Sequence, residues 1–545
     1  MAMFSNALIR PDGKYRHRVR EWAAGRKDIL AGCALAGLAA WPRLHGLGDY
    51  SLTLDESTIV EFARGVLEHG YPVVKVGSME VPLATYELLP YVMAPFLALL
   101  GQSDFAIRLS AALFGIATTY LIYDTSMRWF DRRVGILAAL LYAFSPWAIY
   151  WGQSSFHPSQ TQFFAFLAVR GAQSLLRAEA ATPRAAYLAA LFFCLAFLSW
   201  EGMGFLLPVV FVTGLVLNRG DWRWLKNVHL WLAIAIAAVV VVGQGVRRVL
   251  VQDSFLMVGS GKSEVSMPQL VFTQTDYSPA FYLKNFFGTE THVVLSMVFL
   301  LGLMFIRRNG NLRFVSALVI TAIVLMTNFL PFYSAHYVYY LLPWFLIATS
   351  AMTFEVIDGL AASPSARFGA VRAAHAVFAG GLILLEIASA TPAGLKLYEL
   401  DKDWQNPYRQ DLRVGLAGID YRGPVETLAA QYRDGDVIVS LAPFPLKLYG
   451  GLSDDYYLQS VAGQKVVYDP AGDSPYYIEK YAGNPVLRSL AEFEDMLYRH
   501  DRVWLLAAPY GIFTSLQDRA LLDFIDKHMT VKADSYDARL YLWSR

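Results

Sequence analysis

Cysteine is nearly absent from this chain of 545 residues, which holds only Cys33 and Cys194. Both lie inside apolar runs, so we expect no disulfide framework, and we expect the two thiols to pack as small hydrophobic side chains. Charge is also scarce, since 17% of the residues are charged and 55% are hydrophobic, whereas about a quarter of the residues in soluble domains are charged. This balance predicts an integral membrane protein.

The C-terminal segment, residues 393–545, lacks the common signatures of nucleotide, metal and nucleic-acid sites. It has no glycine-rich phosphate loop, no Cys/His cluster at metal-binding spacing and no nucleic-acid-binding motif. The net charge of +1 gives no indication of a partner either. We therefore expect no nucleic-acid partner.

The amino end resembles a secretory signal in outline. Residues 1–27 are polar and basic and precede the apolar run 29–41. That run continues into Pro42 and Arg43 and is followed by many more hydrophobic segments. A retained first span with a cytoplasmic tail therefore fits better than a cleaved signal peptide.

Apolar runs suited to spanning a bilayer recur along the rest of the chain. One further run, 81–100, has the composition of a span but contains Pro82, Pro90 and Pro95, which would break a straight helix. Whether this run crosses the membrane decides the orientation of everything after it. The other runs lie near 105–126, 134–151, 160–176, 185–200, 203–218, 228–245, 292–306, 314–331, 337–354 and 371–391.

The basic residues of the short loops favour one orientation, because cytoplasmic loops are enriched in Lys and Arg. If 81–100 does not cross, the arginine-bearing loops face the cytoplasm, and the loops without Lys or Arg, at 151–160, 200–204 and 331–336, face outward. We therefore predict that 81–100 lies in or dips into the outer interface and that about eleven helices span the membrane, with the amino end inside and the carboxyl end outside. The basic residues of the predicted cytoplasmic loops are Arg128, Arg132, Arg133, Arg170, Arg177, Arg184, Arg219, Arg223, Lys226, Arg307, Arg308, Arg313, Arg367 and Arg372.

The predicted fold is an α-helical polytopic membrane protein with a C-terminal extracytoplasmic α/β domain. Its parts are a cytoplasmic tail at 1–27, a transmembrane module at 28–392 with outer loops at 48–104 and 246–291, and a soluble domain at 393–545. Strand and helix alternation predicts the α/β class of the last part. The strand-like runs are 436–441, 464–468, 503–508 and 539–542, and the helical stretches include 425–432 and 489–498.

The first outer loop is the best candidate for chemistry. Asp55 and Glu56 follow the first span closely and are flanked by Leu52 and Leu54. Acidic loops at a membrane surface are often only solvated. A carboxylate near the hydrocarbon edge is partly desolvated, however, and can act as a base or hold a cation.

The sequence around these carboxylates resembles the GT-C glycosyltransferases, and more narrowly the protein O-mannosyltransferase and lipid A aminoarabinose transferase branch. The similarity depends on the order and spacing of several short motifs and is best over residues 40–200. The motifs are RLHGL at 43–47, LDE at 54–56, GYP at 70–72, Pro82-Leu83, Gly101, RLSAALFG at 108–115, RWFDRR at 128–133, YAFSP at 142–146 and His336-Tyr337 before Leu341-Leu342-Pro343.

This resemblance implies an inverting transfer of a sugar from a polyprenyl-phosphate carrier to a glycan, lipid or protein acceptor at the outer face of a bacterial inner membrane. The family's catalytic Asp matches Asp55, which would take the proton of the acceptor hydroxyl, and Glu56 would orient Asp55 or the acceptor. The leaving phosphate needs its charge met by cationic groups. The residues that could meet it are Arg247, Arg248, Arg108 and His336, each of which could instead anchor the protein at lipid headgroups.

Two departures from the aminoarabinose branch place its donor and acceptor in doubt. The amphipathic segment begins Glu80-Val81-Pro82-Leu83 where that branch has a Lys-Pro-Pro-Leu pattern, and the second outer loop has His157-Pro158-Ser159 where that branch has Arg-Pro-Asp. We take His157, Tyr337 and Glu80 as candidate acceptor or sugar ligands. The sequence leaves open a divalent metal ion, for which Glu80 and His292 form a weak signature.

A transporter or flippase of a lipid-linked substrate is the main alternative class, and a non-catalytic scaffold is a third. Transporters usually carry ionisable residues near the bilayer midplane and show internal repeats. The predicted spans have almost no charge in their middles, no repeat is evident, and the polar clusters lie at the outer ends. These features favour the glycosyltransferase.

Overall fold

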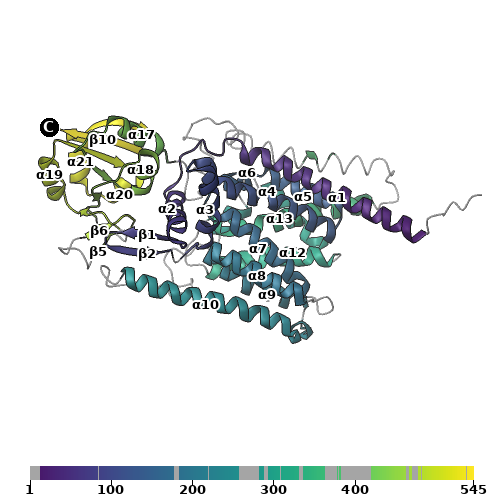
Figure 1. Ribbon diagram of the computed structural model, residues 1–545. Coiled ribbons are helices and arrows are strands. Elements are labelled where there is room, and N and C mark those ends of the chain that lie inside the picture. The colour runs from purple at the N-terminus through teal and green to yellow at the C-terminus, as the bar shows by residue number, and fades with distance from the viewer. Residues whose placement is uncertain are drawn as a thin grey trace, which may run out of the picture.

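The computed structural model describes a helical body and a smaller C-terminal domain. It covers residues 13–545 apart from 84, 177–182, 219, 257–280, 288–292, 307–308, 330–334, 362–376, 378–379, 382–418, 462–465, 469–476, 480 and 536. Figure 1 shows the C-terminal domain at one end of the molecule, with α2 (Leu54–His69) and α3 (Leu88–Leu100) between it and the long helices.

The helical body is built from long apolar helices that pack on one another through a single large hydrophobic cluster. Its remaining α-helices are α1 (Gly13–Leu44), α4 (Asp104–Trp129), α5 (Arg132–Phe144), α6 (Pro146–Gly152), α7 (Pro158–Leu175), α8 (Pro183–Ser199), α9 (Leu206–Asn218), α10 (Val228–Leu256), α11 (Val293–Gly302), α12 (Gly310–Phe329) and α13 (Leu342–Ala361). Short helices η1 (Glu201–Phe205), η2 (Arg223–Lys226), η4 (Leu283–Phe287), η5 (Leu303–Phe305) and η6 (Ala335–Leu341) join or extend them.

Among the described residues, 5 helical segments are long and apolar enough to cross a membrane, or up to 6 if the bent pair α5 and α6 forms one span. These segments fall on predicted spans, and the chain is a multi-pass membrane protein. The predicted total of about eleven spans stays a prediction. The predicted span at 371–391 lies largely outside the described residues.

The segment 81–100 forms a helix too short to span the bilayer. Helix α3 has 13 residues, which at 1.5 Å per residue extend about 20 Å, whereas a hydrocarbon core is about 30 Å thick. Its first residues, up to Pro82, belong instead to a strand. This agrees with the expectation that the run does not cross.

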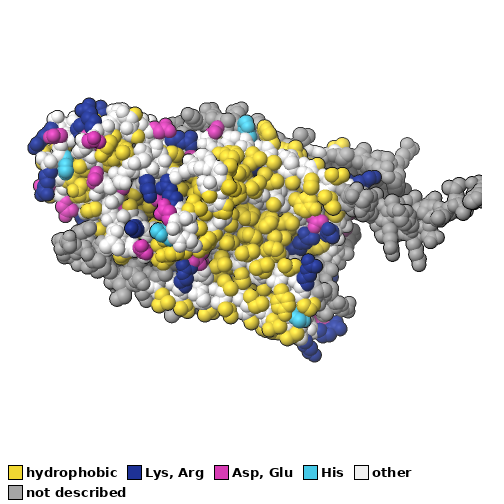
Figure 2. Space-filling model, viewed as in Figure 1, with side chains coloured by type: hydrophobic (Ala, Val, Ile, Leu, Met, Phe, Trp, Pro, Cys, Tyr) yellow, Lys and Arg dark blue, Asp and Glu magenta, His cyan; other side chains and the backbone are white. Residues whose placement is uncertain are grey.

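The surface of the body has the polarity that a bilayer requires. Figure 2 shows a broad hydrophobic face over the long helices, with charged side chains gathered on the C-terminal domain, at the junction beside it and at the opposite end of the body. Helix α10 exposes large apolar side chains along its length, including Val239 at 73% and Val242 at 63% exposure. Such a surface is stable against lipid and not against water.

The end of α1 is fixed by a buried arginine. Arg43 donates hydrogen bonds to the carbonyl oxygens of Ala143 (3.0 Å) and Tyr142 (3.1 Å) and is fully buried. A Cβ atom at Gly115 would lie 2.7 Å from its Nε atom, so glycine is required at that position for the guanidinium to fit. A charge this deep is stable only with such partners.

The C-terminal domain has a four-stranded sheet of order β3-β8-β10-β9, in which β3 runs parallel to β8 and the other pairs are antiparallel. The four predicted strands and both predicted helices are confirmed within a few residues. The domain comprises β3 (Val437–Ser440), β4 (Tyr457–Leu458), β5 (Val466–Tyr468), β6 (Tyr477–Glu479), β7 (Val486–Leu487), β8 (Arg502–Ala507), β9 (Thr530–Ser535), β10 (Ala538–Ser544), α17 (Arg422–Gln431), α18 (Pro443–Gly450), α19 (Leu490–Arg499), α20 (Tyr510–Ser515) and α21 (Arg519–His528).

The first outer loop carries a β-hairpin that the sequence did not predict. Strand β1 (Val73–Val76) pairs antiparallel with β2 (Met79–Pro82), and Gly77 in the turn has a φ of 59°, which favours glycine. The amide of Gly77 donates to the carbonyl of Ala482 (3.2 Å), so the turn contacts the C-terminal domain. Figure 1 shows this hairpin beside β5 and β6.

Candidate functional site

Asp55 lies in the first turn of α2, at the junction of the two parts of the molecule. Thr53 caps this helix: its hydroxyl accepts from the Glu56 amide (3.2 Å), and the Glu56 carboxylate accepts from the Thr53 amide (2.9 Å). This reciprocal capping box fixes where the helix begins. The positive end of the helix dipole at this turn stabilises an ionised Asp55.

Glu56 is buried and paired, so its role differs from that of its neighbour. Its carboxylate accepts two hydrogen bonds from Arg108 (2.9 and 3.0 Å) and one from the Ser155 amide (2.8 Å). Burial alone would raise the pKa of Glu56, but the charge and hydrogen bonds of Arg108 and the amides of Thr53 and Ser155 together outweigh burial and lower it. Glu56 is therefore held as an anion that positions the start of α2.

Arg108 does not lie where it could meet a donor phosphate. Only 4% of its surface is exposed, and its guanidinium also donates to the carbonyl oxygens of Tyr50 (2.9 Å) and Ser51 (3.0 Å). Its hydrogen-bonding groups are thus taken up by Glu56 and the loop before α2. These contacts give Arg108 a positioning role in this structure, because a buried and fully paired arginine has no free face for a ligand. The phosphate role stays a prediction.

Beneath the start of α2, four rings stack in a column. His157 stacks on Tyr86 with ring centroids 5.1 Å apart, and on its other face it stacks on Trp200, also at 5.1 Å. Trp200 in turn stacks on Tyr337 (4.8 Å), and His336 meets the edges of His157 (5.4 Å) and Tyr337 (4.5 Å). Three residues singled out from the sequence, His157, His336 and Tyr337, are therefore brought together.

Asp55 and Arg248 belong to the same site, since both act on the Tyr86 hydroxyl. Burial raises the pKa of Tyr86, the charges of Glu201 and Asp55 raise it further, and Arg248 lowers it. Arg248 pairs with Glu201 at 3.3 Å and remains nearly half exposed. A carboxylate and a partly accessible guanidinium therefore lie near enough to the Tyr86 phenol to influence its pKa.

Arg247 points to a different partner. It forms an ion pair with Glu87 and donates to the Leu83 carbonyl oxygen (3.2 Å). It thus ties α10 to the segment before α3. Of the two adjacent arginines, Arg248 is the one placed with Asp55 and Tyr337.

Glu80 lies apart from this group, in a polar cleft between α2, the hairpin and the C-terminal domain. His292, its suggested partner for a metal ion, lies outside the described residues. Within the described part of the chain, no group of three or more His, Cys, Asp or Glu side chains could hold a metal ion.

The C-terminal domain contacts the loop that precedes α2 directly. The Tyr449 hydroxyl accepts from the Leu52 amide (2.6 Å) and donates to Asp104 (2.8 Å). Arg422 donates to the Gly48 carbonyl oxygen (2.9 Å) and forms an ion pair with Asp104. The loop that carries Asp55 is therefore held between α4 and the C-terminal domain.

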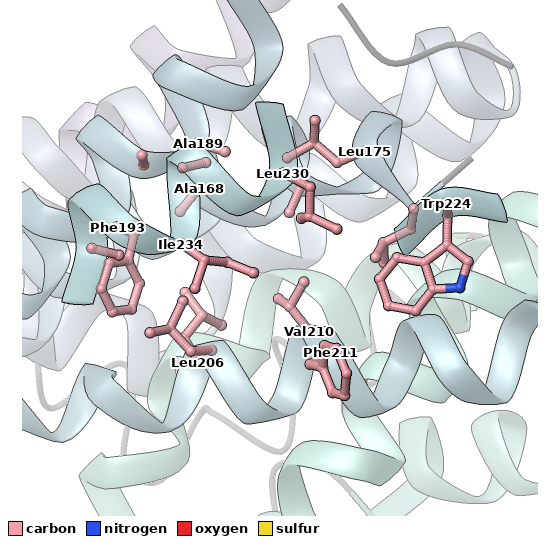
Figure 3. Close-up of a pocket in the computed structure, with 16 residues that line it drawn as sticks. Ala168, Leu175, Ala189, Phe193, Leu206, Val210, Phe211, Trp224, Leu230 and Ile234 are labelled. Carbon is pink, nitrogen blue, oxygen red and sulfur yellow. The ribbon is translucent and has the colours of Figure 1, made fainter. Parts of the chain in front are cut away.

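A second, apolar cavity offers no chemistry. It holds about 80 Å³ between α7, α8, α9 and α10, and Figure 3 shows Phe193, Leu206 and Trp224 among the side chains that line it. All of its lining residues are apolar. It has no group that could accept a proton or bind a phosphate.

Tyr86, Trp200 and Glu201 are site residues that sequence reasoning missed. Trp200 and Glu201 lie in a short loop without Lys or Arg, and an isolated carboxylate beside a tryptophan in such a loop was the available signal. Tyr86 has a φ of 54°, which few non-glycine residues adopt, and no sequence pattern predicts this conformation.

Comparison with known proteins relates this geometry to an enzyme class. Residues 87–244 match the family described as dolichyl-phosphate-mannose-protein mannosyltransferase. No curated protein matches the chain.

Solved structures share the fold. The apo crystal structure of ArnT from Cupriavidus metallidurans aligns with a TM-score of 0.60 at 14% identity, over 95% of this chain and 98% of that chain. ArnT bound to undecaprenyl phosphate aligns with a TM-score of 0.61 at 14% identity, over 94% and 97%. The archaeal oligosaccharyltransferase AglB from Archaeoglobus fulgidus aligns with a TM-score of 0.48 at 12% identity, over 78% and 64%.

The fold and the matched segment support the class of membrane glycosyltransferases known as the GT-C superfamily. The likeness to ArnT, at 14% identity, is a likeness of fold. The resemblance seen in the sequence and the predicted fold class are confirmed, and the transporter alternative is not favoured.

Proposed function

We propose that this protein is an inverting glycosyltransferase that takes a sugar from a polyprenyl-phosphate carrier and places it on an acceptor hydroxyl, with Asp55 as the base. The observation that supports this most is that Asp55, Arg248 and Tyr337 all lie near enough to Tyr86 to influence its pKa. The match to a mannosyltransferase family and the structure of ArnT with undecaprenyl phosphate point to the same donor class.

Proton acceptance and stabilisation of the leaving phosphate take place at the two ends of the site. Asp55, ionised at neutral pH and favoured by the helix dipole, accepts the proton of the acceptor hydroxyl as that oxygen attacks the anomeric carbon. The bond from the anomeric carbon to the phosphate oxygen breaks, and the lipid phosphate leaves with the bonding pair. Arg248 meets its negative charge, for which the phosphate must compete with Glu201.

The stacked rings suit the sugar between these ends. Aromatic faces pack against the apolar faces of sugar rings, and polar groups at their edges fix the orientation. We assign Tyr86 and Tyr337 to this role. His157, wedged between Tyr86 and Trp200 and only 1% exposed, holds the column together.

The proposed reaction takes place at the outer face of a bacterial inner membrane, with the amino end in the cytoplasm and the domain at 393–545 in the periplasm. The basic loops of the sequence favour this orientation. Reporter fusions after Arg133 should report cytoplasm, and fusions at Gly70 and Gly450 should report the exterior. A cytoplasmic reading at Gly450 would reverse the proposed face.

The test of the reaction is Asp55→Asn, which keeps the shape of the side chain and removes the proton acceptor. Transfer from a synthetic polyprenyl-phosphate sugar should fall at least about a hundredfold, the low end for loss of a general base. Donor binding and thermal stability should be retained. Asp49→Asn, the same change in the same loop, is the matched control, and a stable Asp55→Asn variant with normal transfer would eliminate Asp55 as the base.

A further inference from the structure

A large polar cleft lies at the junction of the helical body and the C-terminal domain, away from the stacked rings. It holds about 490 Å³, and neither Asp55 nor Tyr86 lines it. Figure 2 shows basic, acidic and histidine side chains gathered at this junction. Its lining includes Glu61, Arg64, Lys447, Ser453, Asp454 and Asn484.

One wall of the cleft is a stripe on α2. Glu61, Arg64 and Glu68 are spaced i, i+3 and i+7, so they share one face of the helix. Asp55 lies in the first turn of the same helix, six residues before Glu61, which is about 9 Å along the axis. The cleft therefore has a fixed position relative to Asp55, but it lies on a different face of α2.

The opposite wall carries a buried carboxyl with an unused oxygen. Asp454 is only 7% exposed, and its Oδ1 accepts from the Asn484 side chain (2.7 Å). Its Oδ2 is buried and has no hydrogen-bond partner among the described residues. Burial and the nearby Glu479 raise the pKa of Asp454 well above its ordinary value. A buried polar atom without a partner is costly, so this carboxyl is a poorly satisfied polar group in the wall of the cleft.

The charges in the cleft balance one another and so disfavour an ionic ligand. Lys447 pairs with Glu61 at 2.6 Å, Arg64 also pairs with Glu61, and Lys75 stands opposite Glu80 in the hairpin. A phosphate would meet several carboxylates here, and a cation would meet several ammonium or guanidinium groups. A neutral ligand that both donates and accepts hydrogen bonds meets no such penalty.

Sugar hydroxyls have that character, and Phe444 adds an apolar surface beside the polar groups. We propose that this junction cleft is a saccharide-binding subsite for a neutral glycan. As a subsite for the acceptor it rests on the proposed transferase function. It would then bind part of the acceptor remote from the reacting hydroxyl, and binding energy gained there positions the acceptor for transfer.

Two substitutions in the full-length protein test the cleft. Ser453→Trp places a large side chain at an exposed lining position, and Asp454→Asn keeps the Asn484 contact but alters the unpaired oxygen. Ser515→Trp, the same change at an exposed serine of α20 that does not line the cleft, is the matched control. The probes are short neutral gluco-, galacto-, manno- and arabino-oligosaccharides, titrated by calorimetry beside glycerol 3-phosphate, inorganic phosphate and Mg²⁺.

We expect at least one neutral oligosaccharide to bind the wild type and the Ser515→Trp control equally, and both cleft variants to weaken it at least about tenfold, a change of about 1.4 kcal/mol. Retained thermal midpoints separate this loss from misfolding. No neutral glycan binding, binding that neither variant changes, or binding of only phosphates or Mg²⁺ would each overturn the proposal.

The same titration with Asp55→Asn separates the subsite from the reaction. If the subsite exists, this variant binds the oligosaccharide as the wild type does. If Asp55→Asn binds the oligosaccharide and also transfers sugar normally, the result contradicts the proposed function and supports the cleft proposal. If transfer is lost in Asp55→Asn but no glycan binds, the cleft proposal fails alone.

Discussion

The Glu56 carboxylate lies 2.9 Å from Nη2 of Arg108, and both side chains are buried. This pair sits one residue from Asp55 and joins the start of α2 to α4. Because Glu56 also accepts from the Thr53 and Ser155 amides, one anion organises three segments of the chain. Its neighbour Asp55 takes its position from this arrangement.

Breaking the Glu56–Arg108 pair should destabilise the protein strongly. Glu56→Gln or Arg108→Met alone leaves a buried charge or a buried acceptor without its partner, which typically costs about 3–5 kcal/mol. The double variant should cost clearly less than the sum of the two. Thermal unfolding in detergent measures this coupling, and strictly additive losses would show that the two side chains act independently.

Removing the Tyr449 hydroxyl should weaken the contact between the C-terminal domain and the loop that precedes α2. Tyr449→Phe leaves the buried Leu52 amide without an acceptor, a loss of about 1–3 kcal/mol. We expect kcat to fall several-fold while the KM for the lipid donor stays near its wild-type value. Tyr498→Phe on the domain surface is the control, and an unchanged kcat in Tyr449→Phe would limit this contact to stability.

The two adjacent arginines should differ in their effect on the donor. Arg248→Ala removes the accessible guanidinium near Asp55 and should weaken donor binding roughly ten- to a hundredfold, the usual range for a charge-assisted contact. Arg248→Lys should recover only part, since an ammonium cannot form the same fork of hydrogen bonds.

Arg247→Ala serves as the matched control, because that side chain is engaged by Glu87 and the Leu83 carbonyl. Its donor affinity should change little. Equal losses in Arg247→Ala and Arg248→Ala, measured by titration with a polyprenyl phosphate, would contradict the assignment of the phosphate to Arg248.

Stability should depend on pH through Asp454. Its pKa is raised in the folded protein, so its stabilising contribution is complete below the unfolded value of about 3.9 and is lost as pH rises toward the folded pKa. Asp454→Asn does not titrate. The thermal midpoint of the variant minus that of the wild type should therefore increase as pH rises from about 4 to 7.

Asp501→Asn, the same change at an exposed position of the same domain, is the matched control. A constant difference between Asp454→Asn and the wild type across this pH range would contradict the raised pKa. The experiment needs no substrate, so its outcome is independent of the proposed reaction.

The regular elements were largely readable from the sequence. The strand-like runs at 436–441 and 503–508 became β3 and β8, because short continuous apolar segments favour buried strands. Strand β9 was missed, since its residues are mostly exposed and include Lys532 and Asp534, as suits the edge of a sheet. Polar edge strands carry no hydrophobic period to detect.

The site was only partly predictable. Asp55 stood out by its place after the first span, and Arg248, His157, His336 and Tyr337 were candidates that the fold brings near it. For Arg108 the sequence indicated a phosphate ligand, which stays a prediction, whereas the structure shows a buried ion pair with Glu56; a position at the end of a span is equally consistent with both. Only packing distinguishes these two.

The sequence by itself determined the membrane class, the resemblance to GT-C enzymes and the alternation of elements in the C-terminal domain, because composition and hydrophobic period are local properties of the chain. The tertiary structure decided which charges are paired and which remain accessible. Glu56 meets Arg108 across 52 positions of the chain, and Tyr449 meets Leu52 across 397. Contacts of that range depend on how helices and strands pack, and no local pattern encodes them.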